Sequence, residues 1–179
     1  ADFRSHRVAA EIVAFGEAAN IAIQLTERAL SNEVITPGKT TLEDVAAIAN
    51  YQETGVDLFT GGRAERLRVL RVSSGYFSVL RSPLQLGRGF DRSDERGTRR
   101  VVLSHASWRV HFLGDPAIVG ATIRLSGRQA EVAGIASPDF EDPIAPDVSA
   151  WIPYDLAGDT YEENNSLTAI GRLRNGIIL

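Results

Sequence analysis

The sequence predicts an α+β fold, with a mixed or antiparallel sheet, a long N-terminal helix and a small α/β lobe inserted in the second half. Apolar residues recur at helical spacing over residues 6–30. From Val56 the spacing changes to the alternation that is typical of strands, with short helical stretches between them. The composition, 44% hydrophobic and 23% charged, is that of a globular protein and excludes wholesale disorder.

We expect the chain to have three parts. Residues 1–40 form a helical N-terminal segment, residues 41–83 and 156–179 form a sheet-bearing subdomain, and residues 84–155 form the inserted lobe. The lobe is expected to have its own small core, made of Val101, Leu103, Trp108, Phe112, Ile123, Val132 and Ile135.

The predicted N-terminal helix covers residues 6–30 and begins after Ser5, a suitable N-cap. Its apolar stripe must be covered, so we expect it to lie on a sheet formed by residues 56–60, 64–72 and 166–174.

A second helix is predicted from Thr40 to about Gln52. It follows a type II turn over residues 36–39, and Thr40 and Glu43 have the spacing of a capping box. The pattern then predicts a hairpin, with strands over 56–60 and 63–72 joined by Gly61-Gly62.

The rest of the chain is predicted to alternate short helices and strands. A helix follows Ser73-Ser74 and ends before Pro83, and the densely charged residues 91–100 form a solvated loop. The further predicted elements are a strand over 101–103, a helix from the N-cap Ser104 to Gly114, a hairpin of 121–125 and 129–135, an irregular Pro-rich connection over 137–149, an edge strand over 151–153 and a last strand over 166–174.

The net charge of −4 is unevenly distributed. Residues 63–109 contain eleven Arg and four acidic residues, whereas the segments on either side are acidic. A basic block can be a nucleic-acid patch, but no aromatic–Arg interleaving accompanies it. We favour the interpretation that these arginines meet the acidic parts of the same molecule, and we expect no nucleic-acid partner.

The residues alone do not argue for an enzyme. No Cys occurs, which excludes disulfides, thiolate metal sites and Cys nucleophiles. His105 and His111 have no neighbouring acid at ligand spacing, and Ser104-His105 belongs to no nucleophile elbow. The weaker candidates are Asp57 and Asp91 as partners of a His, the acidic patch Asp139, Glu141, Asp142 and Asp147 as a weak cation site, and the glycines of Gly61-Gly62 and Gly87-Arg88-Gly89 as phosphate loops. We predict no catalytic, cofactor-binding or metal-binding residue.

No run of eighteen apolar residues occurs, so no segment is predicted to span a bilayer, and the start does not resemble a signal peptide. Because the sequence contains no Met, we expect it to be a piece of something longer or an engineered chain.

Residues 41–176 resemble the extracytoplasmic core domain of MacB-like ABC-transporter permeases. The resemblance rests on an ordered series: Arg71–Leu80, Leu86–Phe90, Val101–Ser104, Trp108, Phe112, Gly114–Pro116, Val119-Gly120, Ile123–Leu125, Val132–Ile135, Pro138, Phe140, Trp151–Pro153 and Gly171–Gly176. It implies that the sheet-bearing subdomain is porter-like and that the parent protein is membrane-embedded. It also implies a periplasmic or extracytoplasmic location and protein partners, either transporter subunits or a periplasmic adaptor. The implied role is non-catalytic, in partner contact or in transmission of conformational change.

Residues 6–46 resemble the start of the catalytic domain of Xaa-Pro-dipeptidase-like, "pita-bread" metallopeptidases. The matching residues are Ala9–Ile12, Glu17–Ala19 and Ile35–Ala46. The metal ligands of that family come later in its sequence, and no such set occurs here, so the resemblance implies no activity. A metallopeptidase-like fragment or fusion without its metal ligands is the alternative hypothesis, and a helix that only mimics the peptidase pattern is a third interpretation.

Overall fold

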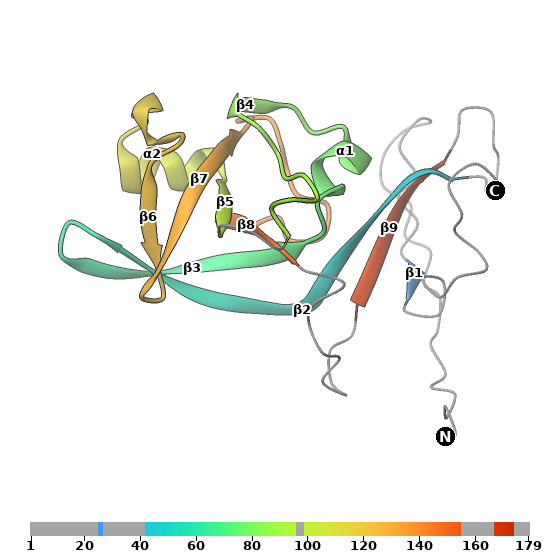
Figure 1. The fold of residues 1–179 in the computed structure, drawn as a ribbon, viewed down its shortest axis with the longest axis horizontal. Coiled ribbons are helices and arrows are strands. Elements are labelled where there is room, and N and C mark those ends of the chain that lie inside the picture. Colours follow the sequence, from blue (N-terminus) through green and yellow to red (C-terminus); the bar gives the residue numbers. More distant parts are fainter. Residues whose placement is uncertain (1–24, 27–41, 96–98, 155–166, 174–179) are drawn as a thin grey trace, which may run out of the picture.

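The computed structural model describes residues 25–26, 42–95, 99–154 and 167–173. Within these residues the chain forms a sheet of nine strands, two α-helices and a 3-10 helix (Figure 1). The elements are β1 (Leu25–Thr26), β2 (Leu42–Thr60), β3 (Arg63–Val72), α1 (Tyr76–Leu80), β4 (Leu84–Gly87), β5 (Arg100–Leu103), α2 (His105–Phe112), the 3-10 helix η2 (Pro116–Ile118), β6 (Thr122–Leu125), β7 (Arg128–Ala136), β8 (Ala150–Pro153) and β9 (Leu167–Leu173).

The strands form a mixed sheet in the order β1-β9-β2-β3-β8-β5-β7-β4, and β6 pairs with both β2 and β7. The β3–β8 and β5–β7 pairs are parallel, and the other described pairs are antiparallel. This arrangement confirms the predicted mixed sheet. The predicted last strand over 166–174 is also present, as β9.

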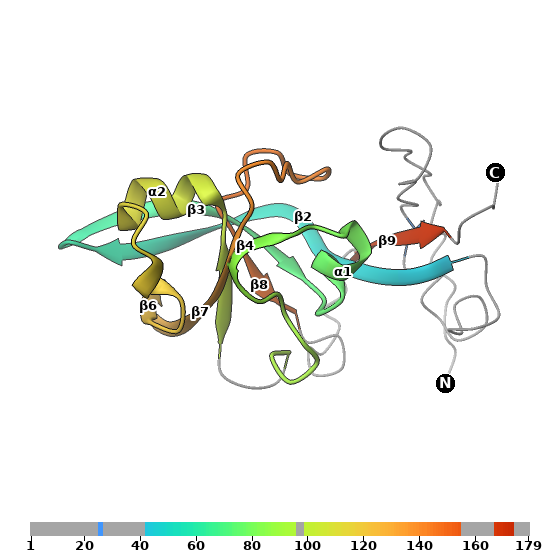
Figure 2. The same ribbon diagram turned by 90° about the horizontal axis from the view of Figure 1, so that it is seen from above.

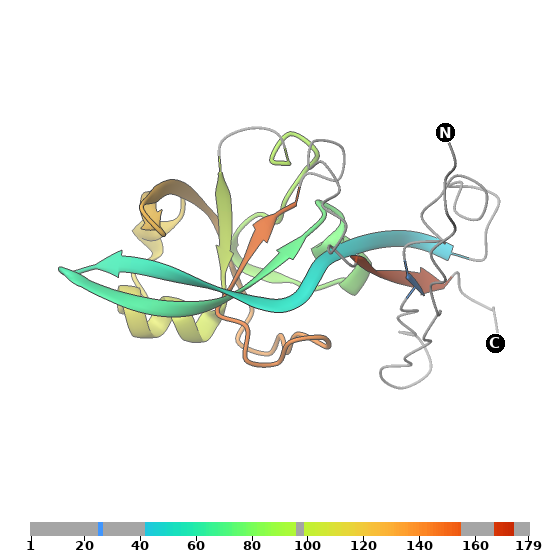
Figure 3. The same cartoon turned by 90° about the horizontal axis from the view of Figure 1, so that it is seen from below.

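Strand β2, with 19 residues, runs the length of the fold and curves along its course (Figure 2). Its first half pairs with β9, from Leu42 opposite Leu173 to Ala49 opposite Leu167. Its second half pairs with β3 and, near the tip of the hairpin, with β6. Figure 3 shows the β2–β3 hairpin extending from one end of the molecule and the β2–β9 pair from the other. We call the β2–β9 pair the arm.

Two of the predicted turns and one predicted helix cap are confirmed. Gly61 and Gly62 join β2 to β3 with φ angles of 56° and 77°, the left-handed conformation that two-residue hairpin turns require. Ser126 and Gly127 do the same between β6 and β7, with φ angles of 45° and 76°. The Ser104 side chain caps α2 by accepting a hydrogen bond from the Ser107 amide.

The helix predicted from Thr40 to Gln52 is wrong, because residues 42–60 form β2. The capping-box spacing and the alanines favour a helix locally. In the folded chain the backbone of this segment is hydrogen-bonded to β9 and to β3. This tertiary pairing overrides the local preference for a helix.

The helix predicted over residues 6–30 is wrong at Leu25–Thr26, which form β1 and pair with Ala169 and Thr168 of β9. The rest of that helix, and its expected packing on the sheet, lie outside the described residues.

Two strands at the other side of the sheet differ from the prediction. Strand β8 was expected at an edge, but it lies between β3 and β5. Strand β4 was not predicted, because its four residues lie between Pro83 and a Gly-rich turn. At Gly87, φ is 70° and a Cβ atom would collide with the Ala133 carbonyl of β7, so the glycine is required by close approach of two strands.

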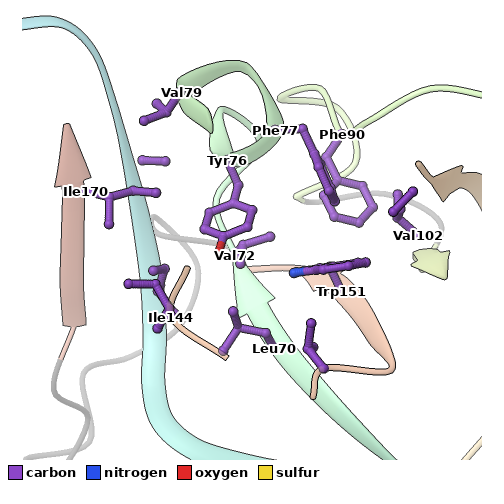
Figure 4. Close-up of a cluster of buried hydrophobic side chains, with 14 of the residues drawn as sticks. Leu70, Val72, Tyr76, Phe77, Val79, Phe90, Val102, Ile144, Trp151 and Ile170 are labelled. Carbon is purple, nitrogen blue, oxygen red and sulfur yellow. The ribbon is translucent and has the colours of Figure 1, made fainter. Parts of the chain in front are cut away.

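Two clusters of buried apolar residues fill the fold. The cluster in Figure 4 lies between the arm, α1 and β8, and Phe77 contacts the Trp151 ring edge-on at a centroid distance of 5.4 Å. The second cluster contains six of the seven side chains predicted for the core of the inserted lobe, with Phe112 packed against it. It also contains Leu58, Leu67 and Val69 from β2 and β3. The division into 1–40, 41–83 with 156–179, and 84–155 remains a prediction.

We expect Leu58→Ala to lower the free energy of unfolding by about 2–5 kcal/mol, because Leu58 is fully buried where β2 meets β6 and its loss leaves a cavity. Leu113→Ala is the matched control, since Leu113 is 86% exposed at the end of α2. Urea unfolding of both variants tests this, and equal losses of stability would contradict the packing of Leu58.

Candidate functional site

Polar side chains join distant segments at three buried places in the described fold. The first is the joint between the arm and α1, made by Ser73 and Arg172. The second is the Asp142 cluster, made by Asp142, Tyr76 and Trp151. The third is the Asp94 cluster, made by Asp94, Arg88 and Arg100.

Ser73 fastens the end of β3 to the middle of β2. Its amide donates to the Ala47 carbonyl at 2.8 Å, and its hydroxyl accepts from the Ala47 amide at 2.9 Å. Both residues are buried. The serine therefore occupies both backbone groups of Ala47 where strand β3 turns toward α1.

Arg172 of β9 reaches the opposite end of α1. Its Nε donates to the Val79 carbonyl at 2.7 Å, and the residue is 6% exposed. Carbonyls in the last turn of a helix lack partners within the helix, and a cationic donor suits them. Arg172 therefore ties the arm to α1.

The Asp142 carboxylate is buried, although the sequence placed it in an exposed acidic patch. Its Oδ2 accepts from the Tyr76 hydroxyl and from Trp151 Nε1, both at 2.8 Å. Its Oδ1 accepts from the amides of Ile144 and Ala145, both at 2.9 Å. In Figure 4 the Tyr76 hydroxyl and the indole nitrogen of Trp151 are both turned into the interior near Val72 and Ile144. The carboxylate holds the fold together here and is not available as a surface cation ligand.

The Asp94 side chain has no exposed surface, so the description of residues 91–100 as a solvated loop is wrong at this point. Asp94 accepts a pair of hydrogen bonds from Arg88, at 2.7 and 3.2 Å, and a further one from Arg100. Next to it, Glu95 accepts from the Ser74 amide at 2.9 Å, just before α1. Asp94 and Glu95 are therefore folded back against the protein, whereas Asp91, Arg92 and Ser93 are exposed.

The arginines around Asp94 set the pKa of its carboxyl group. Burial alone would raise the pKa of Asp94, but hydrogen bonds from Arg88, from the Asp91 amide and from Arg100 outweigh it and lower the pKa to about 2. Asp94 is therefore ionised across the physiological range.

Several arginines of the basic block form salt bridges within the molecule. Arg66 pairs with Asp57 at 3.3 Å, and Arg68 pairs with Asp147 at 2.8 Å. Arg100 also contacts Glu131. These pairs follow the interpretation that the block meets the acidic parts of the chain.

The two described histidines of α2 are placed by packing. His105 lies edge-on to the Trp108 ring, at a centroid distance of 5.6 Å. His111 Nδ1 lies 2.8 Å from Glu65 Oε2, an acid that is not near it in the sequence. Sequence spacing could not reveal the pair, because Glu65 lies on a different element, β3. Among the described residues, no group of three or more His, Asp or Glu side chains could hold a metal ion.

In the described part of the chain, neither α-helix has the length and apolar character needed to cross a membrane. The buried polar groups described above connect different helices, strands and loops, and so fix their relative positions. Ser73, Asp142 and Arg172 are all buried. Each is hydrogen-bonded to a backbone group or to an aromatic side chain of another element, and such buried bonds specify how the elements are joined.

Comparison with known proteins places this fold. The family model of the MacB-like periplasmic core domain matches residues 7–177. The periplasmic region of MacB from Actinobacillus actinomycetemcomitans superposes with a TM-score of 0.60 at 15% identity, over 84% of this chain and 64% of that one. The extracellular domain of the noncanonic ABC-type transporter YknZ from Gram-positive bacteria gives a TM-score of 0.59 at 17% identity, over 86% and 75%.

The chain thus spans 64% of the length of the MacB periplasmic region that it matches. No curated protein gives a significant match. The family match begins at residue 7 and includes most of the segment that resembles a metallopeptidase. That second resemblance gains no support from the comparisons.

We expect Asp94→Asn to lower the free energy of unfolding at neutral pH by about 1–3 kcal/mol, because Arg88 and Arg100 would then face a neutral amide. In the unchanged protein the pKa of Asp94 falls from 3.8 to about 2 on folding. The ionised carboxylate therefore stabilises the fold above about pH 4, and this contribution of about 2 kcal/mol is lost as the pH falls toward 2.

Urea unfolding between pH 7 and pH 2 measures both effects. The control is Asp139→Asn, because Asp139 is exposed. Parallel pH profiles for the unchanged protein and the Asp94 variant would contradict the assignment.

Proposed function

The chain belongs to the family of MacB-like periplasmic core domains, and on this premise we propose that it is a non-catalytic extracytoplasmic domain of an ABC-transporter permease. Its proposed role is to transmit conformational change during transport or to contact protein partners. The expected partners are transporter subunits or an adaptor on the same side of the membrane.

The observation that carries the transmission role is the geometry of the arm. Leu42 and Leu173 lie opposite each other, so the chain enters β2 and leaves β9 at the same end of the arm. In permeases that this chain resembles, the domain lies between two membrane helices. A displacement of those helices would then enter through this pair of strands.

The inner part of the arm supports the same role. Ser73 joins it to β3, and Arg172 joins it to α1. Ala46, Ile48 and Ile170 belong to the same buried cluster as Tyr76 and Trp151. Because packed interiors have low compressibility, a displacement of the arm is passed to its neighbours.

We also propose that the domain catalyses no reaction. The buried polar groups described above are bonded to structural partners, and His111 and Ser104 have structural contacts. The alternative of a metallopeptidase-like fragment lacks a comparable observation in its favour.

The extracytoplasmic location can be tested with a thiol introduced into this domain, whose sequence contains no Cys, in a permease from which any cysteines outside the domain have been replaced. We expect Leu113→Cys, at an 86% exposed position, to react in intact cells with a membrane-impermeant maleimide when the permease containing this domain is expressed. The buried Leu58→Cys is the control and should react only after denaturation. Labelling of Leu113→Cys only after the cells are broken would contradict the location.

The transmission role predicts that Arg172→Gln in the same permease reduces transport several-fold while nucleotide hydrolysis continues, because α1 loses its bond to the arm. The matched control is Arg124→Gln, which removes an exposed arginine of β6. Transport and hydrolysis are measured at equal expression. Equal transport by the two variants would count against the role of the arm.

A further inference from the structure

The Pro-rich connection over residues 137–149 is held by the buried carboxylate of Asp142, which is not part of the joint between the arm and α1. Asp142 is 2% exposed and accepts four hydrogen bonds. Two come from amides of the connection itself, which fold it around the carboxylate, and two come from other elements. A buried carboxylate that lost these donors would be strongly unfavourable, so the bonds specify where the connection lies.

The two outside donors belong to α1 and to β8. Tyr76 is the first residue of α1, and Trp151 lies within β8. The Tyr76 ring is fully buried, between the arm and Trp151 in Figure 4. The connection is therefore bonded to α1 at the end where the helix begins.

The other end of α1 is bonded to the arm, through Arg172 and the Val79 carbonyl. Within this five-residue helix, the last turn is bonded to Arg172 of the arm, and the side chain of the first residue is bonded to Asp142. Tyr76, Phe77 and Val79 are buried, so the helix is packed on its sides as well. Because packed interiors have low compressibility, we expect this short helix, held at both ends, to move as one body.

The far end of the connection is attached to the β2–β3 hairpin. Asp147 forms a salt bridge with Arg68 at 2.8 Å, and the Ser149 amide donates to the Arg68 carbonyl at 2.8 Å. The connection therefore extends from the start of α1 to the middle of β3.

We propose that residues 137–149 act as a strap that follows α1, with the Tyr76–Asp142 hydrogen bond as its point of attachment. Displacement of the arm shifts α1 through Arg172, and α1 shifts the strap through Tyr76. This inference rests on the proposed function, because it extends the path of a displacement from the arm to the hairpin.

The test is a double-mutant cycle read by amide hydrogen exchange in the 179-residue chain. The four proteins are the unchanged chain, Arg172→Gln, Tyr76→Phe and the double variant. Tyr76→Phe removes one hydroxyl and keeps the ring, so the apolar contacts of α1 remain. The Ile144 and Ala145 amides, which donate to Asp142, report on the strap, and the Ser82 amide, which donates to Phe77, reports on α1.

In the unchanged background we expect Arg172→Gln to speed exchange at the Ile144 and Ala145 amides by about fivefold or more, relative to amides of β7. In the Tyr76→Phe background the same substitution should speed their exchange by less than about twofold. The Ser82 amide should respond to Arg172→Gln in both backgrounds. Arg124→Gln should change none of these rates. If Arg172→Gln does not fold, Arg172→Lys is used, since it keeps the charge and removes the Nε donor.

Equal effects of Arg172→Gln in the two Tyr76 backgrounds would overturn the strap, and so would changes at Ile144 that only follow those of β7. The exchange experiment and the transport assay can give different outcomes, so failure of the strap can be told apart from failure of the proposed function. Loss of transport with an additive cycle would leave the proposed function standing without the strap. Coupled exchange with unchanged transport would support the strap and count against the proposed function.

Discussion

The fold depends on one long strand, β2, whose backbone must be hydrogen-bonded along its length. Its first half is paired by β9 and its second half by β3, and β6 takes the other side near the hairpin tip. Because backbone amides and carbonyls that are removed from water need partners, β2 sets the register of these three neighbours. The register shift in its middle, between Ala49 and Thr54, lies where the pairing with β9 ends. The arm and the hairpin are therefore two parts of one continuous element.

Side chains with buried polar groups then position the segments that the sheet does not hold. Asp94 draws the charged residues 91–95 onto Arg88 and Arg100, and Asp142 folds residues 142–145 around its own carboxylate. Both are ionisable groups placed where burial without partners would be unfavourable. Such contacts are directional, so they specify one arrangement of the segments in addition to whatever stability remains after hydration is lost. Loops joined in this way have definite positions relative to the sheet.

The accuracy of sequence reasoning follows the sequence distance between interacting residues. The turn at Gly61-Gly62, the hairpin at Ser126-Gly127 and the cap at Ser104 are predictable, because their signals and partners lie within a few residues. The strand character of residues 42–52 is not, because it comes from β3 and β9 while the local capping signal favours a helix. The joints of the site are hidden for the same reason: Tyr76 and Asp142 are 66 residues apart, and Arg172 and Val79 are 93 apart. An acidic residue in a Pro-rich segment resembles solvated surface until its partners are known.

The chemistry of these joints agrees with a role in movement. A catalytic group must be exposed to a substrate and is often held with an altered affinity for protons. Asp142 and Arg172 are instead enclosed, and the contacts described above join them to backbone groups and to the Tyr76 and Trp151 side chains. Hydrogen bonds of this kind are directional, so they resist sliding of α1 along the arm in a way that apolar packing alone does not. Ser73, Asp142 and Arg172 make such directional contacts where the arm, α1 and the Pro-rich connection meet, as the proposed transmission of displacement requires.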